Sequence, residues 1–248
     1  MLTTMPCRSA DTPDTLFNGR LFCRQPAQGY RFSIDAVLLA HFCRPAAGET
    51  VVDLGAGCGV VSLILAYRHP GVALVAVEAQ EELARCCAEN ARANSFTHRL
   101  QVVAGDVRRI RELLPPESCQ RVVCTPPYGQ MDRGRVSPNP ERRAARHEGV
   151  ATVEDFAAAA AFVLRNRCRA AFVFSAARLP GLLAALRRVR LEPKVLRLVH
   201  SYPGADASLV LVEAIKNGGE ELRVLPPLYV YREQNGAYSE EVAACYAP

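Results

Sequence analysis

Val51-Val52-Asp53-Leu54-Gly55-Ala56-Gly57-Cys58-Gly59-Val60 is the stretch that decides the fold of this 248-residue chain. Two apolar residues lead into an acid, glycines follow with single residues between them, and an apolar run continues to Tyr67. This pattern predicts a buried strand, a tight turn and a helix. Glycines allow positive φ angles and a close approach of a ligand to the main chain. The start of the helix offers unpaired N–H groups to an anionic group.

The spacing Asp-x-Gly-x-Gly-x-Gly differs from the Gly-x-Gly-x-x-Gly of dinucleotide sites, which disfavours a nicotinamide dehydrogenase. Asp53 would repel a pyrophosphate, but it would pair with an ammonium group. S-adenosylmethionine carries both an ammonium and a carboxylate, and the stretch resembles the glycine-rich motif of class I S-adenosylmethionine-dependent methyltransferases. We therefore expect Asp53, Gly55, Gly57 and Gly59 to bind this cofactor. A generic glycine-rich turn in an α/β protein is the alternative.

Strand and helix patterns alternate along most of the chain, which predicts right-handed crossovers and a mostly parallel sheet. We expect a seven-stranded, Rossmann-like class I methyltransferase sheet, α/β in class, with helices on both faces. Strands are expected at 50–54, 72–77, 100–104, 121–124, 170–174, 195–200 and 209–214. Helices are expected at 33–42, 60–67, 81–94, 110–114, 152–164 and 179–188. Residues 1–248 are expected to form a single domain, with 1–30 an irregular lead-in that contains hairpin-like apolar pairs around Asn18-Gly19.

Composition excludes several classes of protein. Half of the residues are apolar, so the chain is globular rather than disordered, and no apolar run is long enough to span a membrane. The first residues lack the apolar segment of a signal peptide. The ten cysteines lie within apolar runs and form no Cys-x-x-Cys pairs, which argues against a metal site or a disulfide scaffold and favours a reducing cytoplasm.

The net charge of +5 conceals an asymmetry. Residues 121–200 carry 15 Lys/Arg and 6 Asp/Glu, a balance of +9, against −4 in the remainder. Such a basic block predicts a polyanionic partner on one face, and solvated helix faces are the alternative.

Acidic residues follow further expected strands. Glu78 ends the second strand, about twenty residues after the glycine-rich turn, where an acid can accept both ribose hydroxyls. Asp106 follows the third strand and is placed to accept from an adenine amino group. Because ligands of open α/β sheets bind at the carboxyl ends of the strands, these acids and the glycine-rich turn predict one cofactor site.

The fourth expected strand leads directly into Thr125-Pro126-Pro127-Tyr128. This tetrapeptide resembles the Asn-Pro-Pro-Tyr motif of amino-group methyltransferases. The resemblance implies that residue 125 and the Pro126 carbonyl orient the target nitrogen while Tyr128 stacks on the base. Two prolines in series restrict φ and hold that carbonyl rigidly. The threonine departs from the motif, because it offers a hydroxyl on a shorter arm in place of an amide.

Several segments together resemble the bacterial tRNA adenine-N6 methyltransferases, which modify an adenosine beside the anticodon of a valine tRNA. They are 32–40, the tetrapeptide, the Arg142/Arg143/Arg146-His147 segment and 224–231. The resemblance covers roughly residues 16–248 and implies that Phe32 and Asp35 lie against the cofactor. The basic loop predicts RNA-binding arginines, namely Arg133, Arg135, Arg142, Arg143 and Arg146.

The leading hypothesis is methyl transfer from S-adenosylmethionine to an exocyclic amine of an RNA base, adenine N6 in tRNA. A guanine-N2 rRNA methyltransferase and a protein glutamine-N5 methyltransferase share the motif and remain alternatives, although the basic loop disfavours a protein substrate. A non-catalytic RNA-binding protein that retains the fold is a third alternative, which the threonine favours.

Overall fold

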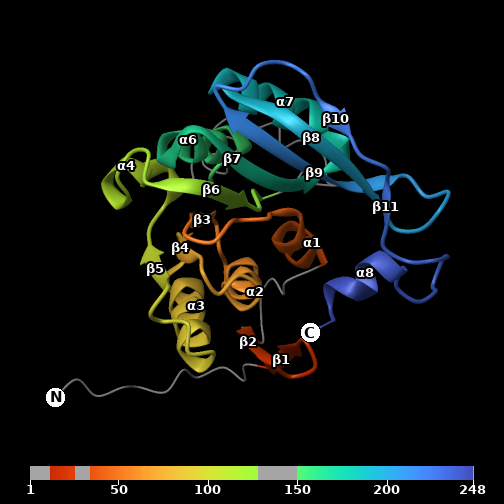
Figure 1. The fold of residues 1–248 in the computed structure, drawn as a ribbon, viewed down its shortest axis with the longest axis horizontal. Coiled ribbons are helices and arrows are strands. Elements are labelled where there is room, and N and C mark those ends of the chain that lie inside the picture. The colour runs from red at the N-terminus through yellow and green to blue at the C-terminus, as the bar shows by residue number, and fades with distance from the viewer. Residues whose placement is uncertain (1–11, 26–33, 128–149, 248) are drawn as a thin grey trace, which may run out of the picture.

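A computed structural model describes residues 12–25, 34–127 and 150–247 (Figure 1). The first part contains the strands β1 (Thr12–Leu16) and β2 (Leu21–Gln25) and then alternates helix and strand as far as β6. These elements are α1 (Ile34–Phe42), β3 (Thr50–Leu54), α2 (Val60–Arg68), β4 (Ala73–Glu78), α3 (Glu81–Ala93), β5 (Leu100–Ala104), α4 (Ile110–Leu113) and β6 (Cys119–Cys124). The second part contains α6 (Val153–Val163), β7 (Leu164–Ser175), α7 (Leu179–Arg188), β8 (Leu191–His200), β9 (Ala207–Lys216), β10 (Arg223–Val224), β11 (Leu228–Tyr229) and α8 (Glu240–Cys245).

One large sheet organises these elements in the order β10-β8-β9-β7-β6-β3-β4-β5, with β11 also paired to β8. Strands β5, β4, β3, β6 and β7 are parallel to one another, and β9 runs antiparallel to both of its neighbours, β7 and β8. This confirms the predicted α/β class and the mostly parallel sheet. From β3 the chain builds outward through β4 to β5, and it then crosses to the other side of β3 to form β6. The topological switch point therefore lies between β3 and β6.

Each face of the sheet has its own apolar core. Helices α1, α2, α3 and α8 pack on one face through residues such as Val37, Ile64 and Val242. Helices α4, α6 and α7 pack on the other through residues such as Ala157 and Leu186. Neighbouring strand residues alternate between the two cores, as a pleated strand requires. The expected helices on both faces are present.

The expected count of seven strands was wrong, because the part of the chain that the structure describes already contributes nine to this sheet. The two additional strands, β10 and β11, are two residues each and both pair in parallel with the edge strand β8. They lie in the proline-bearing tail, where Pro226 and Pro227 separate them and hide any alternating pattern. Pairs this short are fixed by contact with β8, so the local pattern of residues carries no sign of them.

The segment 12–25 was expected to be part of an irregular lead-in, but it forms the antiparallel hairpin β1–β2 that the apolar pairs around Asn18-Gly19 suggested. Phe17 stacks on Tyr67 of α2 with ring centroids 4.7 Å apart. Asn90 of α3 and Asn94, which caps the end of that helix, bind the hairpin from the side. The Asn94 amide exchanges hydrogen bonds with Phe22 N and O at 2.9 and 2.7 Å, and the Asn90 amide does the same with Arg24 at 2.8 and 3.0 Å.

Asn90 also donates to the Cys58 carbonyl of the glycine-rich turn at 2.9 Å, and its side chain is fully buried. We expect Asn90→Ala to lower the free energy of unfolding by about 2–3 kcal/mol, because it leaves buried main-chain groups without partners. Asn94→Ala is the matched control, and its loss should be about 1 kcal/mol because water can replace its exposed bonds to Phe22. Urea unfolding of both variants measures the difference. Equal losses would show that Asn90 has no special role.

Candidate functional site

The expected cofactor and catalytic segments meet at the carboxyl edge of the central strands. In the sheet, Leu54 of β3 pairs with Val77 of β4 and with Cys124 of β6. The glycine-rich turn, Glu78 and Thr125 therefore begin side by side. Gly55 N and Ala56 N both donate to the Val77 carbonyl, at 2.9 and 3.0 Å, which holds the turn against the end of β4. This arrangement places the candidate site at the topological switch point, where ligands bind in open α/β sheets.

The three glycines of the turn all have positive φ, and they differ in what surrounds them. A Cβ on Gly59 would lie 2.4 Å from Cys87 Sγ, and one on Gly55 would lie 3.0 Å from the Phe156 ring. These two positions need glycine for packing as well as for backbone conformation. A Cβ on Gly57 would meet no atom within 4 Å, so the backbone of Gly57 faces open space. The middle of the turn is therefore where a ligand can approach the main chain.

Asp53 lies beneath this turn and is completely buried. Its Oδ2 accepts a hydrogen bond from the Ser62 hydroxyl at 2.7 Å, and its Oδ1 has no partner among the described residues. Burial raises the pKa of Asp53 to about 7, although the hydrogen bonds from Ser62 act in the opposite direction. A positive charge bound above the turn would favour the carboxylate form.

Glu78 connects the glycine-rich turn to the next loop. Its Oε2 accepts from Gly57 N at 2.8 Å and its Oε1 accepts from Gln80 N at 2.9 Å. The side chain is buried, with 6% of its surface exposed. A carboxylate has about four lone-pair positions, so two remain for hydroxyl donors of a ligand.

Thr125 lies directly beside the turn. Its Oγ1 donates to the Gly55 carbonyl at 3.5 Å, a long hydrogen bond that leaves the hydroxyl lone pairs available to a second donor. Pro126 is buried and Pro127 is exposed. Tyr128, the last member of the tetrapeptide, lies outside the described residues, as do Phe32 and the candidate RNA-binding arginines Arg133, Arg135, Arg142, Arg143 and Arg146.

The two remaining acids are engaged within the chain. Asp106 accepts from Arg108 N at 2.8 Å and forms an ion pair with the Arg108 guanidinium, and this pairing lowers the pKa of Asp106. Its place after β5 is as expected, but its carboxylate already caps the short 3-10 turn Val107–Arg109. Asp35 is buried in the first turn of α1, where its Oδ1 accepts from Ala36 N at 2.9 Å.

Sequence reasoning missed the residues that support the turn from behind. Ser62 holds Asp53, Asn90 holds the Cys58 carbonyl, and Cys87 and Phe156 close around Gly59 and Gly55. A signal was present for the two polar residues. Ser62 interrupts an apolar helix, and Asn90 lies on the buried stripe of α3 with Cys86, Cys87 and Ala91. A polar residue on a buried face requires a partner.

Comparison with known proteins agrees with this geometry. Residues 33–178, more than half of the chain, match the family model described as the methyltransferase small domain. The chain belongs to the methyltransferase small domain family. Methyltransferases of this family and fold use S-adenosylmethionine in general. The matched range runs from just before α1 to just before α7 and includes the carboxyl edge described above.

Relatives of this methyltransferase bear one recurring name. A protein of Shewanella halifaxensis is 27% identical over 85% of this chain and 88% of its own length. One of Porphyromonas gingivalis is 26% identical over 81% of both chains. Both are named tRNA1(Val) (adenine(37)-N6)-methyltransferase, which confirms the resemblance found in the sequence.

Solved structures confirm the methyltransferase fold. A predicted O-methyltransferase from Agrobacterium tumefaciens has a TM-score of 0.71 and 24% identity over 86% of this chain and 95% of its own. TrmN from Thermus thermophilus has a TM-score of 0.53 and 19% identity over 73% of this chain and 48% of its own.

Within residues 12–25, 34–127 and 150–247, no helix could cross a membrane and no cluster of histidines, cysteines and acids could hold a metal ion.

The pKa of Asp53 makes a prediction about stability. An acid whose pKa rises on folding, here from 3.8 to about 7, is destabilising at neutral pH, and the penalty disappears as the pH falls below 3.8 and the acid is protonated in both states. Asp53→Asn removes the charge, so its stability relative to the wild type should rise between pH 4 and pH 8 by up to ~4 kcal/mol. Urea unfolding at several pH values measures this change.

The control for Asp53→Asn is Asp106→Asn. The stability of this variant relative to the wild type should fall, rather than rise, as the pH increases. The pKa of Asp106 is lowered by Arg108, so the wild type gains stability from this acid above its ordinary pKa and loses it as the pH falls. Asp106→Asn should therefore be less stable than the wild type at pH 8 and equal to it in acid. A pH-independent difference for Asp53→Asn would mean that Asp53 titrates normally in the folded protein.

Proposed function

We propose that this chain transfers a methyl group from S-adenosylmethionine to an exocyclic amine of an RNA base, adenine N6 in tRNA. The observation that carries the proposal is the position of Thr125-Pro126 against the glycine-rich turn at the switch point, with the Thr125 hydroxyl 3.5 Å from the Gly55 carbonyl. A target amine held by Thr125 would lie next to whatever the turn binds. The names of the relatives support the same substrate.

The residues of the carboxyl edge fit this cofactor. Gly57 leaves open space above the main chain, which suits the approach of the amino-acid part to the start of α2. Asp53 offers the electrostatic attraction that an ammonium needs, and its Oδ1 is an acceptor without a partner among the described residues. Glu78 is held by two backbone N–H groups with lone pairs left for the ribose hydroxyls. Asp35 and Phe32 would border the cofactor, and Asp106 would accept from its adenine after releasing Arg108.

When bound, S-adenosylmethionine supplies a methyl group on a positively charged sulfur, which needs no further activation. The work left to the chain is alignment of the acceptor. The Thr125 hydroxyl donates its hydrogen bond to the Gly55 carbonyl, so the lone pairs of Oγ1 can accept one N–H of the target amine. The Pro126 carbonyl accepts the other, and together they direct the nitrogen lone pair. Tyr128 would stack on the base, and the amine proton would leave to water after the transfer.

The remaining parts of the proposal concern the RNA. Arginines at 133, 135, 142, 143 and 146 would contact phosphates around the stacked base. The enzyme would act in the cytoplasm as a single domain spanning residues 1–248.

Cofactor binding can be tested at Glu78. We expect Glu78→Ala to weaken S-adenosylmethionine binding by ~1–3 kcal/mol in titration calorimetry, because the ribose hydroxyls lose a buried acceptor. Glu81→Ala is the matched control, since Glu81 is an exposed acid at the start of α3, and it should bind as the wild type does. If both variants bind equally well, Glu78 does not hold the cofactor.

The acceptor can be tested at Thr125 with tritiated S-adenosylmethionine, tRNA from a strain lacking the gene, and nucleoside analysis. The expected product of the wild type is N6-methyladenosine. Thr125→Asn restores the amide of the family motif and should maintain or raise the rate. Thr125→Val keeps the shape without the hydroxyl, so it should be slower by about tenfold or more.

Two results would contradict the adenine assignment. One is a wild type that methylates only guanine or a protein glutamine. The other is an active wild type whose activity Thr125→Asn abolishes, because the site would then be built for a different acceptor. A wild type that binds both cofactor and tRNA but yields no methylated nucleoside would favour the non-catalytic RNA-binding alternative.

A further inference from the structure

Three turns meet at the edge of the sheet opposite to Thr125, where the parallel strands begin. They are the start of β7 at 164–167, the turn from α7 to β8 at 187–190 and the end of β9 at 216–219. Asn217 joins the three. Its N–H donates to the Arg190 carbonyl at 2.8 Å, its carbonyl accepts from the Arg167 guanidinium at 2.8 Å, and its side-chain amide donates to Asn166 at 3.0 Å. The turns therefore form one connected surface.

Basic side chains gather on this surface. Residues 150–200 carry nine of the fifteen Lys/Arg of the basic block found in the sequence. Six of the nine lie on the turns or directly after them, and Lys216 at the end of β9 adds a seventh. We call these seven the basic turn surface: Arg165, Arg167, Arg187, Arg188, Arg190, Lys194 and Lys216.

Acids neutralise only part of this charge. Glu192 and Glu220 both pair with Arg187, at 3.2 and 3.1 Å. Glu117 pairs with Lys216 at 3.0 Å. Two of the seven basic side chains thus have acidic partners, and the two acids on Arg187 share one cation.

Four of the other side chains have no ion-pair partner among the described residues: Arg165, Arg167, Arg188 and Arg190. All four are exposed. Arg165 and Arg167 each donate to a main-chain carbonyl, at 3.1 and 2.8 Å. These bonds hold two guanidinium groups in place without neutralising them, so the surface presents positive charge to an external anion.

The backbone is strained at two of these four positions. Arg167 has a φ of 63° and Arg190 a φ of 60°. This left-handed conformation is adopted easily by glycine and asparagine and rarely by other residues. Asn217, with a φ of 54°, is of the favoured type. Arginine at the two other positions is costly for the backbone, and such strain is typical of sites that bind a ligand.

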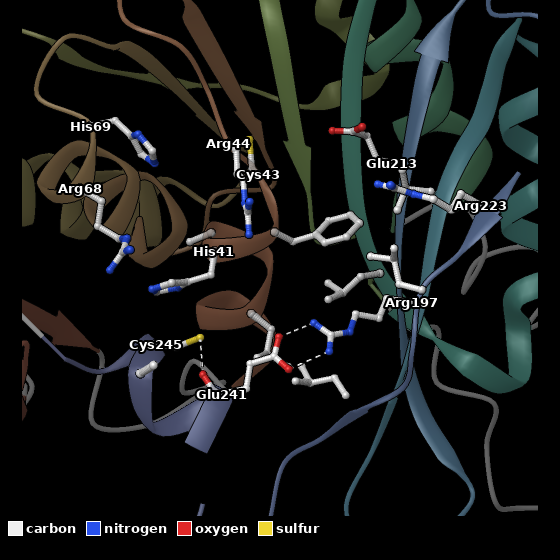
Figure 2. Close-up of a pocket in the computed structure, with 18 residues that line it drawn as sticks. His41, Cys43, Arg44, Arg68, His69, Arg197, Glu213, Arg223, Glu241 and Cys245 are labelled. Atoms are coloured by element: carbon white, nitrogen blue, oxygen red, sulfur yellow. Dashed lines mark hydrogen bonds and ion pairs between the residues drawn. The ribbon is translucent and has the colours of Figure 1, made fainter. Parts of the chain in front are cut away.

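Other arginines of the chain do not form a surface of this kind. Several line a cavity of about 690 Å³ between α1, β8, β9 and α8. Figure 2 shows Arg68 on the helix side of this cavity and Arg223 on the strand side, while Arg197 is paired with Glu241. Their charges are separated or neutralised, whereas those of the basic turn surface are joined through Asn217.

The basic turn surface also lacks the apolar centre of a protein interface. The exposed large apolar side chains of the described residues lie elsewhere, and none is on the three turns. Guanidinium groups without an apolar centre suit phosphate, which they bind through charge-assisted hydrogen bonds.

The partner is a polymer. Phe172 of β7 pairs with Cys124, the last residue of β6, and it follows Arg167 by five residues. At ~3.3 Å per residue, the surface lies roughly 17 Å from the start of the tetrapeptide. One nucleotide cannot reach from Thr125 to the turns, but a folded RNA can.

We propose that the basic turn surface binds the phosphate backbone of the substrate RNA at a stretch remote from the target base. This rests on the proposed function in taking RNA as the partner. It adds a second RNA contact at the opposite edge of the sheet from the site of methyl transfer. Binding is measured without S-adenosylmethionine, so the test does not depend on catalysis.

The affinity of the full chain for labelled tRNA at several salt concentrations tests the proposal. The surface variant combines Arg167→Asn, Arg188→Gln and Arg190→Asn, in which asparagine suits the two left-handed positions. Each phosphate contact contributes about 0.7–0.9 to the log–log salt slope, so we expect the slope to flatten by about two units. At low salt the affinity should fall by about tenfold or more.

Two further triple variants serve as controls. Arg20→Gln, Arg68→Gln and Arg92→Gln remove the same charge at exposed positions on the hairpin, α2 and α3, and should keep the wild-type slope. Arg167→Lys, Arg188→Lys and Arg190→Lys keep the charge and should also keep the slope. S-adenosylhomocysteine binding and thermal unfolding check that every variant is folded.

Equal slopes and equal affinities for the surface variant and the wild type would overturn the proposal, even if the wild type methylates tRNA. The same holds if the surface variant loses affinity for heparin, a sulfated polyanion, but not for tRNA. If tRNA binding depends on the surface and no N6-methyladenosine forms, the surface stands and the proposed methyl transfer fails.

Discussion

The pair of hydrogen bonds accepted by the Glu78 carboxylate is the constraint on which the rest of the carboxyl edge depends. One comes from Gly57 in the turn after β3, and the other comes from Gln80 in the loop after β4. A glycine-rich turn is conformationally free on its own. An anionic acceptor attached to the neighbouring strand removes that freedom and sets the turn at a fixed height above the sheet. The same side chain can therefore shape the loop and face a ligand.

The chain supports this turn from below as well. Asp53 is buried without full compensation, and burial raises the pKa of Asp53 to about 7. Such a group lowers stability in the absence of a ligand, and a bound cation would relieve it. Gly55 and Gly59 are closed in by Phe156 and Cys87, so the turn has little room to relax. The site thus combines a rigid frame with an unsatisfied charge, which is the expected design of a pocket prepared for a charged cofactor.

The sequence predicted much of this arrangement because parallel strands carry long apolar runs and end at one edge. That rule brought Asp53, Glu78 and Thr125 together correctly, and their roles remain predictions. It failed where structure depends on distant contacts. Strands β10 and β11 exist only because β8 offers an edge. Periodicity also says nothing about local ion pairs, so the pairing of Asp106 with Arg108 was not predicted, and the role of Asp106 toward a ligand stays a prediction. The hydrogen bonds of Asn90 to Arg24 and Cys58, which are 66 and 32 positions away in the sequence, could not be predicted for the same reason.

The hairpin β1–β2 has a further consequence. A two-stranded ribbon exposes unpaired backbone groups along its outer edges, and such edges recruit strands of other molecules. Here the amides of Asn90 and Asn94 occupy the N–H and C=O groups of Arg24 and Phe22, as a third strand would. The side chains of a helix offer no further backbone N–H and C=O groups for a strand to pair with. The strand-to-strand hydrogen bonding therefore ends at these two asparagines. The backbone groups of Phe22 and Arg24 on this edge are therefore already paired, which leaves them unable to accept a strand of another molecule.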